Sequence, residues 1–175
     1  MMETNDNISV LISEERLNER IKEMGEEISR AYKGRELHLI SILKGGVFFT
    51  CELAKRITVP VYVDFMSVSS YGSGKQTSGA VKIIKDLDES IDGMDVMVVE
   101  DIIDSGTTLS YLMDLLKQRR PASLALCTLL DKPERRLHEV KVDYTGFKVP
   151  DKFIVGYGLD YAQRYRNLPY IGVID

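Results

Sequence analysis

The chain has only two cysteines, no long apolar run and fewer basic than acidic residues. Cys51 and Cys127 each lie among apolar or small residues, which favours reduced core thiols over catalytic ones. No apolar run approaches the ~20 residues of a membrane-spanning helix, and the polar segment Met1–Ser9 is unlike a signal peptide. A net charge of −4 gives no indication of a general affinity for nucleic acid or anionic membranes. We therefore expect a cytoplasmic protein that binds neither nucleic acid nor membranes.

Two common nucleotide-binding motifs are also missing. No segment matches G-x-x-x-x-G-K-[ST], because Ser69 stands where the first glycine would precede Gly74 and Lys75. No G-x-G-x-x-G motif opens a helix after the first expected strand. A P-loop kinase and a dinucleotide-dependent dehydrogenase are therefore disfavoured.

Helices and strands are expected to alternate over the middle of the chain. A length of 175 residues, 44% of them apolar and 29% charged, suits one globular domain. Ser13 is expected to cap a first helix, in which Leu17, Ile21, Met24 and Ile28 form an apolar stripe. The expected helices are 14–32, 47–56 and 109–119, and the expected strands are 37–43, 59–68, 81–84, 96–99 and 124–130, with a strand-rich segment after about residue 140. This alternation predicts an α/β fold, with a central, mainly parallel sheet flanked by helices.

Residues 69–79 are polar and rich in glycine, so this segment cannot bury one side of itself. We expect a mobile loop here. A plain surface loop without a function is the alternative.

The most informative segment is the acidic one around residues 96–109. A strand that ends at Val99 would place Glu100 and Asp101 at the carboxyl edge of the sheet, where ligands of open α/β sheets bind. Asp104–Thr108 would then form the loop before the next helix, and its backbone N–H groups and hydroxyls suit a phosphate. Carboxylates repel phosphate, but a ribose diol can donate to them and Mg²⁺ can bridge them to phosphate oxygens. A solvated acidic turn with an ordinary helix cap is the alternative.

The same segment, Val98–Thr108, resembles the phosphoribosyl-pyrophosphate motif of the type I phosphoribosyltransferase family, and more narrowly its hypoxanthine-guanine branch. The similarity to this family runs from about residue 10 to the end of the chain. Its other segments are, in order, Leu43–Gly46, Ser70–Tyr71, Asp131–Pro133, and Asp151–Tyr161 followed by Arg166. The resemblance implies the family's fold, with a core at about 35–140, a small hood from about 1–34 and 141–175, and a mobile lid at 69–79, all within one domain, 1–175.

The resemblance also implies the residues of the site. Those that bind the phosphoribose are expected to be Glu100, Asp101, Asp104, Ser105, Gly106, Thr107 and Thr108. Lys44, Gly45 and Arg166 would bind the pyrophosphate, and Lys132, Phe153, Ile154 and Asp160 the purine. The lid would carry Ser70 and Tyr71, and a Mg²⁺ ion would be held by Glu100, Asp101 and Asp160.

Two of these residues have a simple chemical logic. Asp104 is the candidate general base, which would accept the purine N7 proton as N9 attacks the sugar. Capping of the following helix is the alternative for Asp104. Lys132 offers three donors and no acceptor, so it would favour a carbonyl oxygen at purine position 6 and reject the 6-amino group of adenine.

The activity implied by the resemblance is purine salvage: transfer of the 5-phosphoribosyl group from phosphoribosyl pyrophosphate to hypoxanthine, guanine or both, by a Mg²⁺-dependent homodimer or homotetramer. One alternative is a phosphoribosyltransferase for another base, such as xanthine, adenine or uracil. Others are a regulator of the same fold that binds nucleic acid, which the acidic net charge disfavours, and a non-catalytic nucleotide-binding module.

Overall fold

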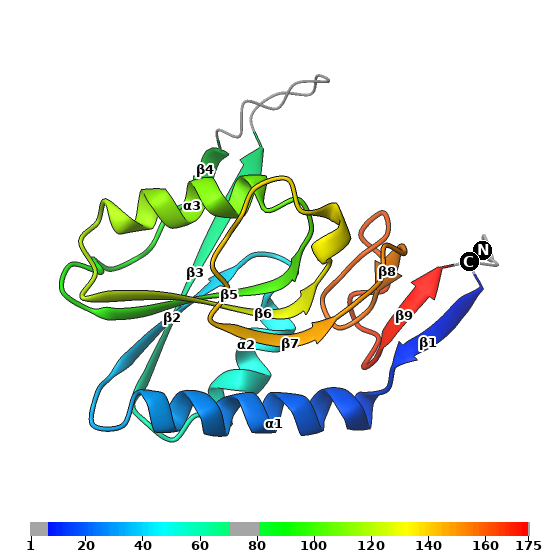
Figure 1. Ribbon diagram of the computed structural model, residues 1–175, viewed down its shortest axis with the longest axis horizontal. Coiled ribbons are helices and arrows are strands. Elements are labelled where there is room, and N and C mark those ends of the chain that lie inside the picture. Colours follow the sequence, from blue (N-terminus) through cyan, green and yellow to red (C-terminus); the bar gives the residue numbers. More distant parts are fainter. Residues whose placement is uncertain (1–6, 71–80, 175) are drawn as a thin grey trace.

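A computed structural model describes residues 7–70 and 81–174, which form two sheets and three α-helices (Figure 1). The central sheet has six strands in the order β4-β3-β2-β5-β6-β7, and a small sheet has the order β1-β9-β8. The elements are β1 (Ile8–Ile12), α1 (Glu14–Ala31), β2 (Leu37–Ile42), α2 (Val47–Ala54), β3 (Val61–Ser70), β4 (Val81–Lys85), β5 (Asp95–Ile103), α3 (Thr107–Lys117), β6 (Ser123–Asp131), the 3₁₀ turn η1 (Pro133–Arg135), β7 (Tyr144–Lys148), β8 (Ile154–Val155) and β9 (Ile171–Ile174).

The central sheet is parallel except at one edge. Strands β3, β2, β5, β6 and β7 all run in the same direction, and only β4 pairs antiparallel, with β3. Such sheets need cover on both faces, which explains why β2 and β5 are apolar along most of their length. The predicted fold class, an α/β protein with a mainly parallel sheet, is confirmed.

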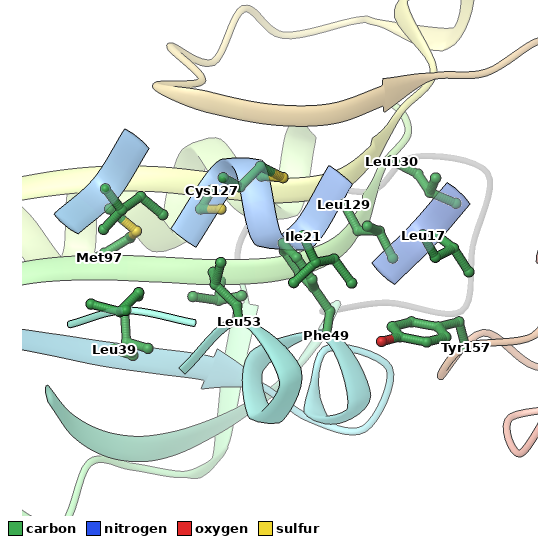
Figure 2. Packing of buried hydrophobic residues seen from close by; sticks show 14 of the residues in the cluster. Leu17, Ile21, Leu39, Phe49, Leu53, Met97, Cys127, Leu129, Leu130 and Tyr157 are labelled. Carbon is green, nitrogen blue, oxygen red and sulfur yellow. The ribbon is translucent and has the colours of Figure 1, made fainter. Parts of the chain in front are cut away.

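Helices α1 and α2 cover one face of the central sheet and α3 covers the other. Alternate residues of β5 divide between the two cores: Met97 and Val99 pack on the side of α1 and α2, whereas Val96 and Val98 pack on the side of α3. Figure 2 shows the first of these cores, in which Leu17 and Ile21 of α1 lie near Phe49 and Leu53 of α2. Because the helices cover the two faces of the sheet, the carboxyl ends of the parallel strands remain available for a site.

Helix α1 follows its sequence pattern closely. The Ser13 side chain accepts a hydrogen bond from the Arg16 backbone N–H, as expected for an N-cap, and Leu17, Ile21, Met24 and Ile28 are buried. The two cysteines differ, because Cys127 is buried in the core but Cys51 is exposed on α2. The prediction of a core thiol is therefore wrong for Cys51: the buried residues of α2 are Phe49, Thr50 and Leu53, which leaves position 51 on the outer side of the helix.

The small sheet joins segments far apart in the sequence. Strand β1 pairs antiparallel with β9, and β9 with β8, so β9 is its middle strand. The small sheet takes up less of the chain than the hood expected from 1–34 and 141–175. Helix α1 and strand β7 fall within those ranges but belong with the central sheet, because α1 packs on α2 and on β7, and β7 pairs with β6. Within the described residues, no helix has the length and apolar character needed to cross a membrane.

The start of the expected lid also differs. Strand β3 continues through Ser69 and Ser70, whose partners in β4 are Lys82 and Val81. Backbone pairing does not depend on apolar side chains, which explains why the strand outlasts its apolar residues. The rest of the expected lid, including Tyr71, lies outside the described residues.

Candidate active site

The site lies at the carboxyl edge of the central sheet, around the end of β5. This strand runs to Ile103, four residues beyond the expected end at Val99, because Glu100, Ile102 and Ile103 still pair with β6. Glu100 and Asp101 therefore belong to the strand and not to the loop after it. The strand fixes their backbone positions, which a loop would not do as firmly.

A pocket of about 180 Å³ lies between the end of β5 and the start of α3. It is lined by Val68, Glu100, Ile102, Ile103, Asp104, Ser105, Gly106, Thr108, Leu109 and Leu112. Five residues predicted to bind phosphoribose are among them, and Thr107 is the first residue of α3. The helix starts two residues before the expected Leu109, so its free backbone N–H groups come close to the loop. A helix N-terminus of this kind suits a phosphate group.

The β5–α3 loop, Asp104–Gly106, has a specific backbone shape. Gly106 has φ = +77°, a left-handed conformation that side chains disfavour. The Ser105 hydroxyl accepts from the Thr107 backbone N–H at 3.3 Å and donates to the Thr107 hydroxyl at 3.2 Å. A side chain at Gly106 would also meet the His138 carbonyl oxygen, so the loop is packed from behind.

Asp104 and Lys132 lie side by side, although they follow different strands. The Lys132 ammonium is 3.6 Å from Asp104 Oδ1, and it donates to the Lys152 carbonyl oxygen at 2.7 Å. Lys132 is only 6% exposed, whereas the Asp104 side chain is 47% exposed. The structure thus places a buried cation next to an accessible carboxylate at the mouth of the site.

A second loop, Leu43–Gly46, approaches the same edge from β2. The Leu43–Lys44 peptide bond is cis. A Cβ atom at Gly45 would overlap the Asp101 carboxylate, and one at Gly158 would overlap the Gly45 carbonyl oxygen. Glycine is therefore required at both positions, where these two backbone segments and the carboxylate meet.

Arg166 brings the C-terminal segment into contact with this loop. Its guanidinium donates to the Gly158 carbonyl oxygen at 2.6 Å and is 2.8 Å from Asp160 Oδ1. The Gln163 side-chain oxygen accepts from both Arg166, at 3.4 Å, and Lys44, at 3.1 Å. The two cations predicted to bind pyrophosphate are therefore gathered around one neutral acceptor. Asp160 Oδ2 accepts from the Gln163 backbone N–H.

Phe153 and Ile154 differ in exposure. Phe153 is 54% exposed, and Tyr161 packs against it edge to face with ring centroids 5.4 Å apart. Ile154 is buried and starts β8, which fixes the neighbouring backbone. An aromatic core position would be covered, so the exposure of Phe153 leaves a ring available for stacking.

The electrostatics of the site centre on Glu100 and Asp101. Burial raises the pKa of Glu100 well above its ordinary value, and the neighbouring Asp101 carboxylate adds to this rise. Burial also raises the pKa of Asp101, against the opposing effects of hydrogen bonds and of the Arg166 charge. Two carboxylates in such surroundings favour a cation beside them. No group of three or more His, Cys, Asp or Glu side chains that could hold a metal occurs in the part of the chain that the structure describes.

The predicted site residues of the Leu43–Gly46 loop, of β5 and the β5–α3 loop, and of the segments around Lys132 and Arg166 come together at this edge. Ser70 is the last residue of β3. Sequence reasoning did not find Arg136, Gln163 and Tyr161, each of which contacts a predicted site residue. No local pattern marks Arg136 or Gln163, because their partners are distant in the sequence. Tyr161 lies inside the segment Asp151–Tyr161, but its contact with Phe153 depends on the fold.

A model of the phosphoribosyl transferase domain matches residues 12–162. The chain belongs to the phosphoribosyltransferase family. The type I phosphoribosyltransferase fold expected from the sequence is confirmed by a crystal structure of a hypoxanthine-guanine phosphoribosyltransferase from Bacillus anthracis. It matches with a TM-score of 0.93 and 49% identity, over 97% of this chain and all of that one.

Two curated relatives of this phosphoribosyltransferase chain differ in length. The hypoxanthine phosphoribosyltransferase of Salmonella typhimurium is 53% identical over 169 residues, which are 95% of each chain. The bifunctional protein TilS/HprT of Listeria monocytogenes is 56% identical over 170 residues, which are 97% of this chain. The chain spans only 26% of the length of that Listeria protein.

Proposed function

We propose that the chain transfers the 5-phosphoribosyl group from phosphoribosyl pyrophosphate to hypoxanthine, guanine or both, and releases pyrophosphate. One observation supports this proposal above the others: the buried Lys132 ammonium lies beside the accessible Asp104 carboxylate at the mouth of the β5–α3 loop. A hydrogen-bond donor and a proton acceptor so placed suit the O6 and N7 atoms of a 6-oxopurine whose N9 faces the ribose. The products would be IMP and GMP.

The base would be read by three groups. Lys132 would donate to O6, and the amino group of adenine would leave donors facing each other. Phe153 would stack on the purine, because its side chain stays largely exposed beside the T-shaped contact with Tyr161. The backbones of Ile154 and Asp160 would contact the far edge of the ring. Asp104 would accept the N7 proton while N9 attacks C1 of the ribose.

The ribose phosphate would lie over the β5–α3 loop. The N-terminus of α3, together with Ser105, Gly106, Thr107 and Thr108, would bind the 5-phosphate. The hydroxyls of the ribose would donate to Glu100 and Asp101 at the end of β5. The site would thus take an anion and a diol on adjacent positions, which explains how carboxylates and a phosphate share one edge.

The pyrophosphate would leave towards Lys44, Gly45 and Arg166. The Gly45 backbone would lie close to an anion because the loop carries no side chain there, and the Arg166 fork matches phosphate oxygens. Positive charge fixed where negative charge develops stabilises the transition state without reorganisation.

The donor set fits Mg²⁺ in a particular way. Glu100 and Asp101 supply two neighbouring carboxylates, and Mg²⁺ characteristically binds one or two carboxylates, substrate phosphates and waters. Asp160 is engaged by Arg166 and by the Gln163 N–H, so it would act through water or after Arg166 turns to the pyrophosphate. The ion would neutralise pyrophosphate charge as the C–O bond breaks. The cytoplasmic location and the homodimer or homotetramer expected from the sequence do not enter this chemistry and stay predictions.

The decisive experiment is an assay of the purified protein with Mg²⁺, phosphoribosyl pyrophosphate and one base at a time. We expect IMP from hypoxanthine, GMP from guanine or both, with no turnover once the metal is chelated. Turnover of only xanthine, adenine or uracil would assign another base. Absence of turnover together with a salt-sensitive gel shift would favour the nucleic-acid-binding regulator.

A further inference from the structure

Arg136 lies behind the β5–α3 loop and contacts two elements at once. Its Nε donates to the Asp104 carbonyl oxygen at 3.2 Å, and its Nη2 pairs with the Asp131 carboxylate. Asp131 is the last residue of β6 and directly precedes Lys132. One planar guanidinium therefore connects the backbone of Asp104 with the strand end that carries Lys132.

The neighbouring loop residues are held in a different way. The Ser105 carbonyl oxygen accepts from the backbone N–H groups of Leu137 and His138, at 2.9 and 3.0 Å. These donors belong to the main chain, so they would remain if the side chain of Arg136 were changed. The Asp104 carbonyl oxygen, by contrast, is bound by the Arg136 guanidinium itself.

The ion pair is well shielded from solvent. The side chains of Arg136 and Asp131 are 18% and 12% exposed, and the Cδ atom of Arg136 lies close behind Gly106. Packing and two acceptors in different directions hold the guanidinium in one orientation. An exposed surface arginine without such partners would not be fixed in this way.

We propose that Arg136 is a positioning residue for the transfer reaction: it holds the Asp104 backbone so that the Asp104 carboxylate stays beside the purine N7 proton and Lys132. The proposal rests on the proposed function, in which Asp104 is the general base. Because Ser105 and Gly106 have their own contacts, the loss of this hold should affect the proton transfer more than phosphoribose binding.

Lysine offers a sharp test, because arginine and lysine differ in shape at the same charge. The guanidinium fork reaches two acceptors, whereas an ammonium is a single point that can pair with Asp131 but cannot also keep the bond to the Asp104 carbonyl oxygen. In Arg136→Lys we expect kcat to fall by about 10- to 100-fold, as for small displacements of a catalytic group. The KM for phosphoribosyl pyrophosphate should stay within about threefold of the wild-type value.

The matched control is Arg119→Lys. Arg119 also uses a fork, with bonds of 2.7 and 2.9 Å to Asp86, but it follows α3 at the opposite edge of the sheet. Its kcat should equal that of the wild type. If Arg136 has a merely structural role, Arg136→Lys keeps the ion pair and leaves kcat unchanged, and that result overturns the proposal. A higher KM with unchanged kcat also overturns it.

If Arg136→Lys does not fold, the double variant Asp131→Asn, Arg136→Gln replaces it. This variant removes both buried charges together, so neither is left unpaired. The same fall in kcat supports the proposal, and wild-type kcat overturns it. A wild-type protein that makes no nucleotide from any 6-oxopurine contradicts the proposed function itself, which separates the two failures.

Discussion

Lys132 carries a charge at a position with little access to water. Its ammonium is held by the Lys152 carbonyl oxygen and faces Asp104. The sequence predicted Lys132 as a purine-binding residue through its resemblance to a family, but it could not predict these partners, which lie on other segments. A buried donor with fixed partners discriminates between bases better than an exposed one, because a mismatched base leaves it unpaired.

Substitution of Lys132 by alanine should therefore weaken base selection. We expect the ratio of kcat/KM for hypoxanthine to that for adenine to fall at least about tenfold, because the donor to O6 is lost. Lys152→Ala is the control, since Lys152 contributes its backbone carbonyl oxygen and not its exposed side chain. An unaltered ratio in Lys132→Ala would assign base reading to another residue.

Asp104 should matter for chemistry more than for binding. In Asp104→Asn, which keeps the shape of the side chain but removes the base, kcat should fall by about 10²- to 10⁴-fold. Equilibrium binding of phosphoribosyl pyrophosphate with Mg²⁺, measured by calorimetry, should change little. Asp114→Asn, an exposed aspartate on α3, serves as the control. A kcat of wild-type size in Asp104→Asn would remove Asp104 from its role.

At the scale of elements, the sequence located helices and strands well but missed some of their ends. Apolar periodicity placed α1 to within a residue, because its buried stripe is regular. Strand β5 was predicted to end four residues too early, since Glu100 and Asp101 are polar and only the pairing of Glu100, Ile102 and Ile103 with β6 shows that the strand continues. Helix α3 was predicted to start late for a similar reason, because Thr107 and Thr108 resemble loop residues.

The contact between the β2–α2 loop and β5 leads to a prediction about Gly45. A Cβ atom there would overlap the Asp101 carboxylate, so Gly45→Ala must displace the loop or the carboxylate. We expect the KM for phosphoribosyl pyrophosphate to rise at least about tenfold, because the loop that we propose to bind the pyrophosphate is displaced. The control is Gly93→Ala: Gly93 has space around it but a φ of +74°, so this change costs stability and leaves KM unchanged. An unchanged KM in Gly45→Ala would show that this close approach is not needed for binding.

At the scale of the whole molecule, the site is shared between the central sheet and the segment around the small sheet. The sequence predicted the α/β class, but it assigned 1–34 and 141–175 to a hood, which is more of the chain than the small sheet takes up. It did not predict that β7 joins the central sheet, nor that β9 pairs with both β1 and β8. Pairing between strands separated by most of the chain leaves no mark on local periodicity. Gln163 and Arg136 escaped prediction for the same reason.

This division predicts that damage to the small sheet should affect purine binding selectively. Val173 is buried in the middle strand and pairs with Ile154 and Ser9, next to the Phe153 backbone. Val173→Ala should cost about 2 kcal/mol of local stability and raise the KM for hypoxanthine several-fold, with little change in the KM for phosphoribosyl pyrophosphate. Steady-state kinetics with each substrate varied in turn separates the two constants. Equal increases in both would contradict the division.

The pairing of β1 with β9 also sets an order of events during synthesis. Strand β1 is translated before the central sheet, yet its partner β9 is translated only after the whole of that sheet. Domains acquire structure from the N-terminal side as they are made, so β1 must wait with an unpaired edge. On the proposed function, the β5–α3 loop would be complete before the segment expected to bind the purine is translated, and transfer would begin only after β9 has been added.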